Sequence, residues 1–167
     1  MSQTSAAQAP HSGVALARHV AMPFEALDPT TPIGQVVARR LREERLIWLT
    51  TIDQRGVPQP LPVTFLWDSV QATILTYSRT DRGRLADLER NPNVALHFDA
   101  SGGDIIVITG TAAVSEQDVP SDQMPEWVDK YRDLLARLGM TAQQSAASAS
   151  VAVRIRPLTV RYTPNPL

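Results

Sequence analysis

The sequence of 167 residues contains no cysteine, so it has no disulfide framework, no thiolate nucleophile and no zinc or iron–sulfur site built on sulfur ligands. It also lacks an excess of charge, because 16 basic and 17 acidic residues leave a net charge of −1. A chain without excess positive charge has no broad surface for a polyphosphate, so we expect no nucleic acid partner. The absence of cysteine is typical of the reducing cytoplasm, where we expect the protein to be located.

Long apolar runs are missing as well. No stretch approaches the roughly 20 apolar residues of a membrane-spanning helix, and the first residues lack a basic segment before an apolar run. We therefore expect no contact with a membrane and no export. Glycine-rich phosphate loops are absent, because the pair Gly102-Gly103 lies in a predicted hairpin turn. The three histidines lack the spacing of metal ligands, and the carboxylates form no acid–base pair, so we predict no metal site and assign no catalytic residue.

Two regions of the chain differ in composition. Residues 1–30 are rich in Ala, Ser, Gln and Pro without a sustained apolar period, which is typical of a flexible N-terminal arm. The apolar residues between Val20 and Leu27 leave open the alternative that the end of this arm lies against a surface. Residues 31–167 are expected to form one globular domain, long enough to bury about 70% of its unfolded surface.

Residue periodicity predicts the elements of this domain. We expect helices at 32–44, 84–89 and 125–138, and strands at 46–52, 57–67, 73–78, 94–99, 105–114 and 151–162. Most strands are joined by hairpin-length loops, so the sheet is antiparallel and must curl to bury its inner face. Pro58, Pro60 and Pro62 place the second strand at an edge or a bend, because proline has no N–H for a sheet ladder. The predicted fold class is mainly β, a small barrel with flanking helices.

The segment YSRTDRGR at 77–84 suits an anionic ligand. It ends a predicted strand and leads into a short helix, with Thr80-Asp81 at the expected helix cap. Arginine forks and the amide groups of a helix start both bind phosphate, so Arg79 and Arg84 predict a phosphate site. The alternative from the residues alone is an ordinary surface on which these arginines pair with acidic neighbours.

Taken together, these segments resemble the pyridoxamine 5′-phosphate oxidase-like split-barrel superfamily. Within it they are most similar to the flavin/deazaflavin oxidoreductases of the B group, whose members commonly use coenzyme F420. The resemblance covers residues 32–163. It is carried by PVTFLWD at 62–68, the Tyr-Ser-Arg strand end at 77–79, the spacing Arg84-x-x-x-Leu88-x-x-x-Pro92, Thr109-Gly110-Thr111 and Arg156-Pro157.

The resemblance implies a six-stranded antiparallel split β-barrel of the FMN-binding type. It also implies a homodimer with the tricyclic ring of the cofactor in a groove at the subunit interface. Family members often carry lysine at the position of Arg84, so this chain keeps the charge but changes the geometry. The cofactor-binding residues implied by position are Pro62, Val63, Thr64 and Phe65 beside the ring, Thr76, Tyr77, Ser78 and Arg79 along the ribityl chain, Arg84 at the phosphate, and Arg156 in the last strand.

The implied function is hydride transfer from reduced coenzyme F420 to a conjugated or unsaturated small-molecule acceptor. A cofactor that carries the hydride itself agrees with the missing acid–base pair, because the protein then supplies placement and exclusion of water. Two alternatives stay open. One is an FMN-dependent oxidase or reductase of the pyridoxamine phosphate oxidase-like type. The other is a split barrel that binds a cofactor or heme without catalysis.

Overall fold

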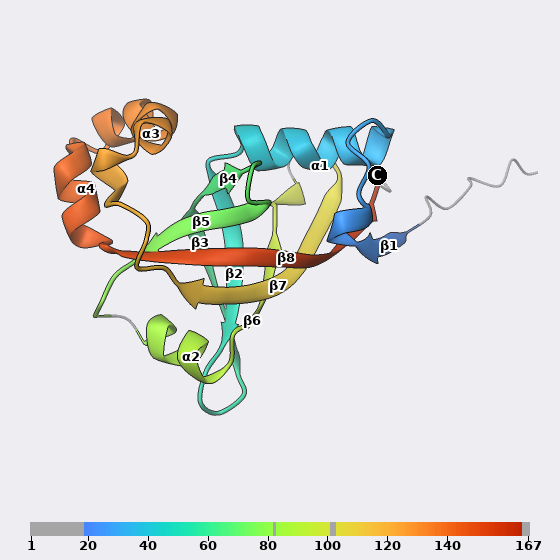
Figure 1. The fold of residues 1–167 in the computed structure, drawn as a ribbon, viewed down its shortest axis with the longest axis horizontal. Helices are drawn as coiled ribbons and strands as arrows, with labels where there is room; N and C mark the ends of the chain where they lie inside the picture. Colours follow the sequence, from blue (N-terminus) through green and yellow to red (C-terminus); the bar gives the residue numbers. More distant parts are fainter. Residues whose placement is uncertain (1–18, 82, 101–102, 165–167) are drawn as a thin grey trace, which may run out of the picture.

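A curved antiparallel sheet forms the centre of the molecule (Figure 1) in this computed structural model, which describes residues 19–81, 83–100 and 103–164. The sheet runs in the order β3-β2-β6-β7-β8-β5-β4, and β1 pairs with β8 beside this path. The strands are β1 (Val20–Pro23), β2 (Leu46–Ile52), β3 (Pro58–Thr64), β4 (Leu66–Asp68), β5 (Thr73–Ser78), β6 (Asn93–His97), β7 (Ile105–Val114) and β8 (Val151–Thr163).

Helices flank the sheet. They are α1 (Pro32–Glu43), α2 (Arg84–Arg90), α3 (Pro125–Arg137) and α4 (Ala142–Ser148), with the short 3-10 turns η1 (Phe24–Ala26) and η3 (Ser121–Gln123). Figure 1 shows α3 and α4 together at one end of β8, while β1 lies at the other end. Over the described residues, none of the helices combines the length and the apolar character needed to cross a membrane. The predicted mainly β fold with flanking helices is confirmed.

All six predicted strands are present, with differences in detail. The expected strand at 57–67 divides at Phe65 into β3 and β4, because the chain leaves β2 there and pairs with β5. The helix α4 was not predicted, since its sequence AQQSAAS has no amphipathic pattern. It begins with a capping box in which the Thr141 side chain and the Gln144 side chain each bind the other residue's backbone.

The strand β3 lies at the edge of the sheet, as its prolines predict. It pairs with β2 over seven residues, from Leu46 opposite Thr64 to Ile52 opposite Pro58. Because proline has no backbone N–H, the hydrogen bonds between β3 and β2 are formed by the residues that lie between the prolines. The carbonyl groups of Pro58, Pro60 and Pro62 therefore point toward the open edge, where these residues offer acceptors and no N–H donors.

The barrel core is built from the inward faces of the strands. Ile47, Leu96, Ile108 and Ile155 are fully buried there, and Val37 of α1 packs against them. The strands β7 and β8 stay paired through a bulge at Thr109/Gly110. A Cβ atom at Gly110 would overlap the carbonyl oxygen of Arg156, so only glycine allows this close approach.

The folded part of the chain begins earlier than the predicted start at residue 31. Val20–Pro23 pairs with β8, with Val20 opposite Tyr162. Met22, Phe24 and Leu27 then pack against the barrel core, so these apolar side chains bury surface that a flexible arm would expose. The rest of the predicted arm, residues 1–18, lies outside the described residues.

Candidate functional site

A groove of about 320 Å³ lies between the edge strand β3 and the end of β5. It brings together side chains that are far apart in the sequence, from β2 and β3 to the C-cap of α4. Seven of the ten cofactor-binding residues predicted from the sequence line it, namely Pro62, Val63, Thr64, Tyr77, Ser78, Arg79 and Arg84, together with Leu46, Leu61 and Ala149. One wall is apolar, and the other carries hydroxyl and guanidinium groups.

The groove follows the seam of the split barrel. The Thr76 hydroxyl donates to the carbonyl oxygen of Thr64 at 2.8 Å and joins β5 to β3 across this seam. Thr76 is 1% exposed and lies on the barrel-facing side of β5, so it supports the groove from below and does not line it. Its predicted contact with a ribityl chain therefore has no direct geometric basis within one subunit.

Phe65 is also placed beneath the groove. Its ring is fully buried, 6.0 Å from the Phe98 ring, and the Lys130 ammonium lies 4.0 Å from its centroid. The backbone of Phe65 is held by Tyr131 of α3, whose hydroxyl oxygen accepts from the Phe65 N–H at 2.7 Å. The Phe65 side chain therefore packs inside the barrel, while its backbone forms the corner at which β3 becomes β4, beside Thr64 of the groove.

The arginine end of the groove differs from the predicted helix cap. The helix α2 begins at Arg84, and its N-cap Gly83 makes no side-chain cap hydrogen bond. The carboxylate of Asp81 instead accepts two hydrogen bonds from Arg79, from Nε at 2.9 Å and from NH2 at 2.9 Å. This pairing raises the pKa of the Arg79 guanidinium above its usual value. The groove therefore ends in Arg79 and Arg84, and Arg79 holds the Asp81 carboxylate.

Arg156 lies outside the groove. It is exposed on the outward face of β8, opposite Thr111 of β7, whereas the β8 residue opposite Ser78 is Val151. Within one subunit Arg156 is therefore separated from the other predicted site residues along the strand.

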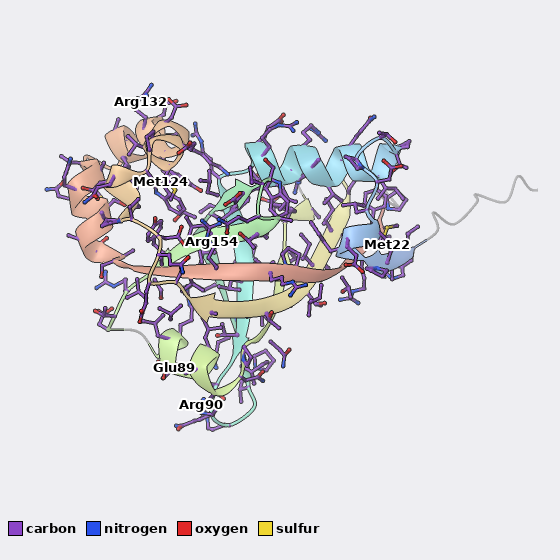
Figure 2. The ribbon with its side chains drawn as sticks, in the orientation of Figure 1. Met22, Glu89, Arg90, Met124, Arg132 and Arg154 are labelled. Carbon is purple, nitrogen blue, oxygen red and sulfur yellow. The ribbon has the colours of Figure 1, made fainter. Side chains whose placement is uncertain are left out.

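Local sequence patterns give no sign of a second charged centre on the same face of β8. Arg154, labelled in Figure 2, donates to Asp118 at 2.6 and 2.9 Å and to Asp68 at 2.7 Å. The hydrogen bonds between Arg154 and Asp118 lower the pKa of the Asp118 carboxyl group and raise that of Arg154. The pKa of Asp68 is lowered chiefly by the backbone N–H of Gln71, with a smaller contribution from Arg154. The alternation of β8 predicts only that Arg154 points outward, since its partners come from the end of β4 and from the segment before η3. The triad ties these segments to β8.

The outward face of β2, β3, β6 and β7 is unusual for a sheet exposed to water. Within these four strands, the outward positions carry no Asp, Glu, Lys or Arg, although the solvent face of an antiparallel sheet is usually polar. Leu46 and Trp48 are 50% and 37% exposed, and the Trp48 ring stacks on the His97 ring at 6.0 Å. The outward residues are Leu46, Trp48, Thr50, Ile52, Pro58, Pro60, Pro62, Thr64, Asn93, Ala95, His97, Ile105, Val107, Thr109, Thr111 and Ala113.

The chain is similar to proteins of known structure. A putative pyridoxamine 5′-phosphate oxidase from Listeria innocua is 22% identical with a TM-score of 0.57, covering 77% of this chain and 95% of that one. The General Stress Protein 26 of Bacillus anthracis is 18% identical with a TM-score of 0.60, covering 81% and 97%. A structure described as an F420 reductase is 21% identical with a TM-score of 0.51, covering 73% and 94%. These TM-scores show a shared fold.

The sequence also identifies a family. No curated protein matches the chain. The family model described as pyridoxamine 5′-phosphate oxidase matches residues 33–164, which include every strand from β2 onward and the whole groove. The chain therefore belongs to the pyridoxamine 5′-phosphate oxidase family.

Proposed function

We propose that the protein is an oxidoreductase that binds a flavin or deazaflavin in the groove beside β3. Its specific reaction is hydride transfer from reduced coenzyme F420 to a conjugated or unsaturated small-molecule acceptor. One observation carries the proposal: a single groove combines an apolar wall, hydroxyl groups and two arginines. The F420 reductase with the same fold supports the choice of a deazaflavin.

The residues of the groove fit such a cofactor in three parts. Leu46, Leu61 and Pro62 offer an apolar surface for a planar ring. The carbonyl groups at the free edge of β3 accept hydrogen bonds from ring N–H groups, and the Ser78 hydroxyl suits a polyhydroxy chain. Arg84 supplies a charged fork for the phosphate at the far end.

The groove is smaller than the complete cofactor requires. Its volume of about 320 Å³ lies at the lower end of the range for ligand pockets, whereas a tricyclic cofactor with a phosphate tail is a large ligand. We propose that a second copy of the chain completes the site. The uncharged outward face of β2, β3, β6 and β7 supports a homodimer, because it borders the groove at Leu46, Pro62 and Thr64 and exposes Trp48. In such a dimer the Arg156 side chain of one subunit contributes to the cofactor groove of the other.

The role of this chain's own residues is then binding and placement. The bound cofactor supplies the hydride chemistry. The apolar wall of the groove orients the ring and excludes water, and the hydroxyl groups and arginines fix the position of the tail. The Thr76 hydroxyl ties β5 to the end of β3, and the Tyr131 hydroxyl holds the backbone at the corner that follows β3.

Cofactor titration tests the proposal. Purified protein is titrated separately with coenzyme F420 and with FMN, followed by fluorescence, and its absorbance spectrum is recorded. Reduction of conjugated acceptors by reduced F420 is then measured. We expect F420 to bind more tightly than FMN and the acceptor to be reduced. Preferential binding of FMN identifies the FMN-dependent alternative, and tight binding without turnover identifies a cofactor carrier. A heme spectrum, or binding of neither cofactor, overturns the proposal.

A further inference from the structure

The contact between Arg79 and Asp81 lies at the phosphate end of the groove. Arg79 lines the groove with Ser78 and Arg84, and Asp81 follows it by two residues. The Asp81 carboxylate accepts from both Nε and NH2 of Arg79, with both distances at 2.9 Å. The pair is therefore a two-point contact in which each carboxylate oxygen has its own donor.

This geometry is the one that a phosphate would use. A guanidinium binds carboxylates and phosphates through the same pair of parallel N–H donors. The Asp81 carboxylate occupies the side of Arg79 formed by Nε and NH2, so a phosphate that binds through these two donors competes with Asp81 for them.

The contact is also easy to exchange. The Arg79 and Asp81 side chains are 49% and 60% exposed, so water surrounds the pair. Exposed ion pairs add little net stability, because solvent screens the charges and the side chains lose conformational freedom. By contrast, Arg154 holds Asp118 with side chains that are 19% and 10% exposed, as expected for a structural pair.

We propose that Asp81 is an internal competitor for the cofactor phosphate: it occupies the Arg79 fork and is displaced when a phosphate ester binds. The inference rests on the proposed cofactor groove and adds a specificity-determining residue to it. Asp81 weakens the binding of any phosphate ester at this end of the groove. It leaves the binding of the same ring and chain without a phosphate unchanged.

The variant Asp81→Asn tests this competition. FMN and riboflavin share the ring and the ribityl chain and differ in the phosphate, so the ratio of their dissociation constants isolates the phosphate contact. Asparagine keeps the size of the side chain and removes its charge. We expect Asp81→Asn to bind FMN about fivefold more tightly than the native chain, with riboflavin affinity unchanged. Coenzyme F420 and its phosphate-free deazaflavin chromophore form a second such pair of ligands.

Two further variants separate competition for Arg79 from a general change of charge. In an Arg79→Gln background, Asp81→Asn should give no further gain, because the fork for which it competes is gone. Asp129→Asn removes the same charge from an exposed pair on α3, 2.7 Å from Arg132, and should leave both ligands unaffected. An equal gain with riboflavin, or a gain that persists without Arg79, overturns the proposal.

Inorganic phosphate gives a readout that does not depend on the cofactor. Phosphate should raise the melting temperature of Asp81→Asn more than that of the native chain, and the Arg79→Gln background should abolish the difference. If FMN and F420 both fail to bind any variant while this difference is present, the cofactor proposal fails and the competition stands. If the cofactors bind and Asp81→Asn changes neither measurement, the competition fails and the cofactor groove stands.

Discussion

The Tyr131 hydroxyl oxygen lies 2.7 Å from the backbone nitrogen of Phe65, although 66 residues separate the two in the sequence. The same oxygen lies 2.7 Å from the Phe65 carbonyl oxygen and 2.8 Å from that of Arg45, so it donates its proton to one of them. A side chain of α3 thus satisfies the backbone at the corner where β3 becomes β4. This corner carries Thr64 and the end of the groove.

Removing that hydroxyl should destabilise the corner. Tyr131→Phe leaves a buried N–H without its acceptor, so we expect the free energy of unfolding to fall by about 1–3 kcal/mol. Urea denaturation measures the change. Tyr162→Phe is the matched control, because the Tyr162 hydroxyl donates to Asp104 at a less buried site and its loss should cost less. Equal losses in the two variants would contradict the assigned role of Tyr131.

Lys130 should make stability depend on pH. Burial lowers the pKa of its ammonium from 10.5 to about 8, against the opposing charge of Glu44, and its buried nitrogen has no hydrogen-bond partner among the described residues. Between these two values the unfolded chain holds more protons than the folded one, so stability rises with pH. Lys130→Met should remove this rise and stabilise the protein at pH 7. Chemical denaturation of both proteins from pH 7 to pH 10 checks the sign, and parallel curves would show that Lys130 does not titrate in this range.

Gly110 should resist substitution. The added Cβ of Gly110→Ala would overlap the Arg156 carbonyl oxygen in the next strand, so β7 and β8 must separate at their bulge. We expect a loss of about 2 kcal/mol or more in thermal or urea unfolding. Gly83→Ala is the control, because nothing lies within 4 Å of its Cβ position and its φ of −60° suits alanine. Its stability should stay within about 0.5 kcal/mol of the native chain.

Arg84 should contribute to cofactor affinity. Arg84→Ala removes a charged donor from the phosphate end of the groove, so we expect the affinity for F420 or FMN to fall about 10- to 100-fold. Fluorescence titration measures it, and melting curves report whether the variant is folded. Arg132→Ala removes an exposed arginine of α3 and should bind as the native chain does. Unchanged affinity in a folded Arg84→Ala variant would remove this residue from the site.

Trp48 should hold two subunits together. Trp48→Glu places a carboxylate at the centre of the uncharged outward face, where a partner would bury it without a counter-charge. Light scattering after gel filtration should show a dimer for the native chain and a monomer for the variant. Val70→Glu changes a 95% exposed residue in the β4–β5 turn and should remain dimeric. A native monomer would contradict the proposed assembly, and with it the shared site.

Local sequence patterns predicted much of this structure. The helix α1 follows from Thr31, whose hydroxyl caps it, and from Pro32 in its first turn. The edge position of β3 follows from its prolines, since their missing N–H groups act locally. The grouping of residues 62–64 with 77–79 followed from the family resemblance, and the groove brings them together.

Contacts that depend on three-dimensional folding were beyond these patterns. The burial of Phe65 depends on Phe98 and on α3, and its own neighbours in the sequence carry no sign of either. The pairing of Val20 with Tyr162 joins the two ends of the described chain, so no local period marks β1 as a strand. Arg154 likewise finds its partners in two distant segments. In each case burial and pairing with remote residues overrode weak local signals.

The three prolines of β3 have a consequence for how molecules can associate. If two copies met along this edge, the carbonyl oxygens of these prolines would face each other without an N–H donor between them. Stacking of barrels into a continuous fibre is therefore disfavoured along the β3 edge of the sheet. That edge remains accessible to a small molecule that brings donors of its own.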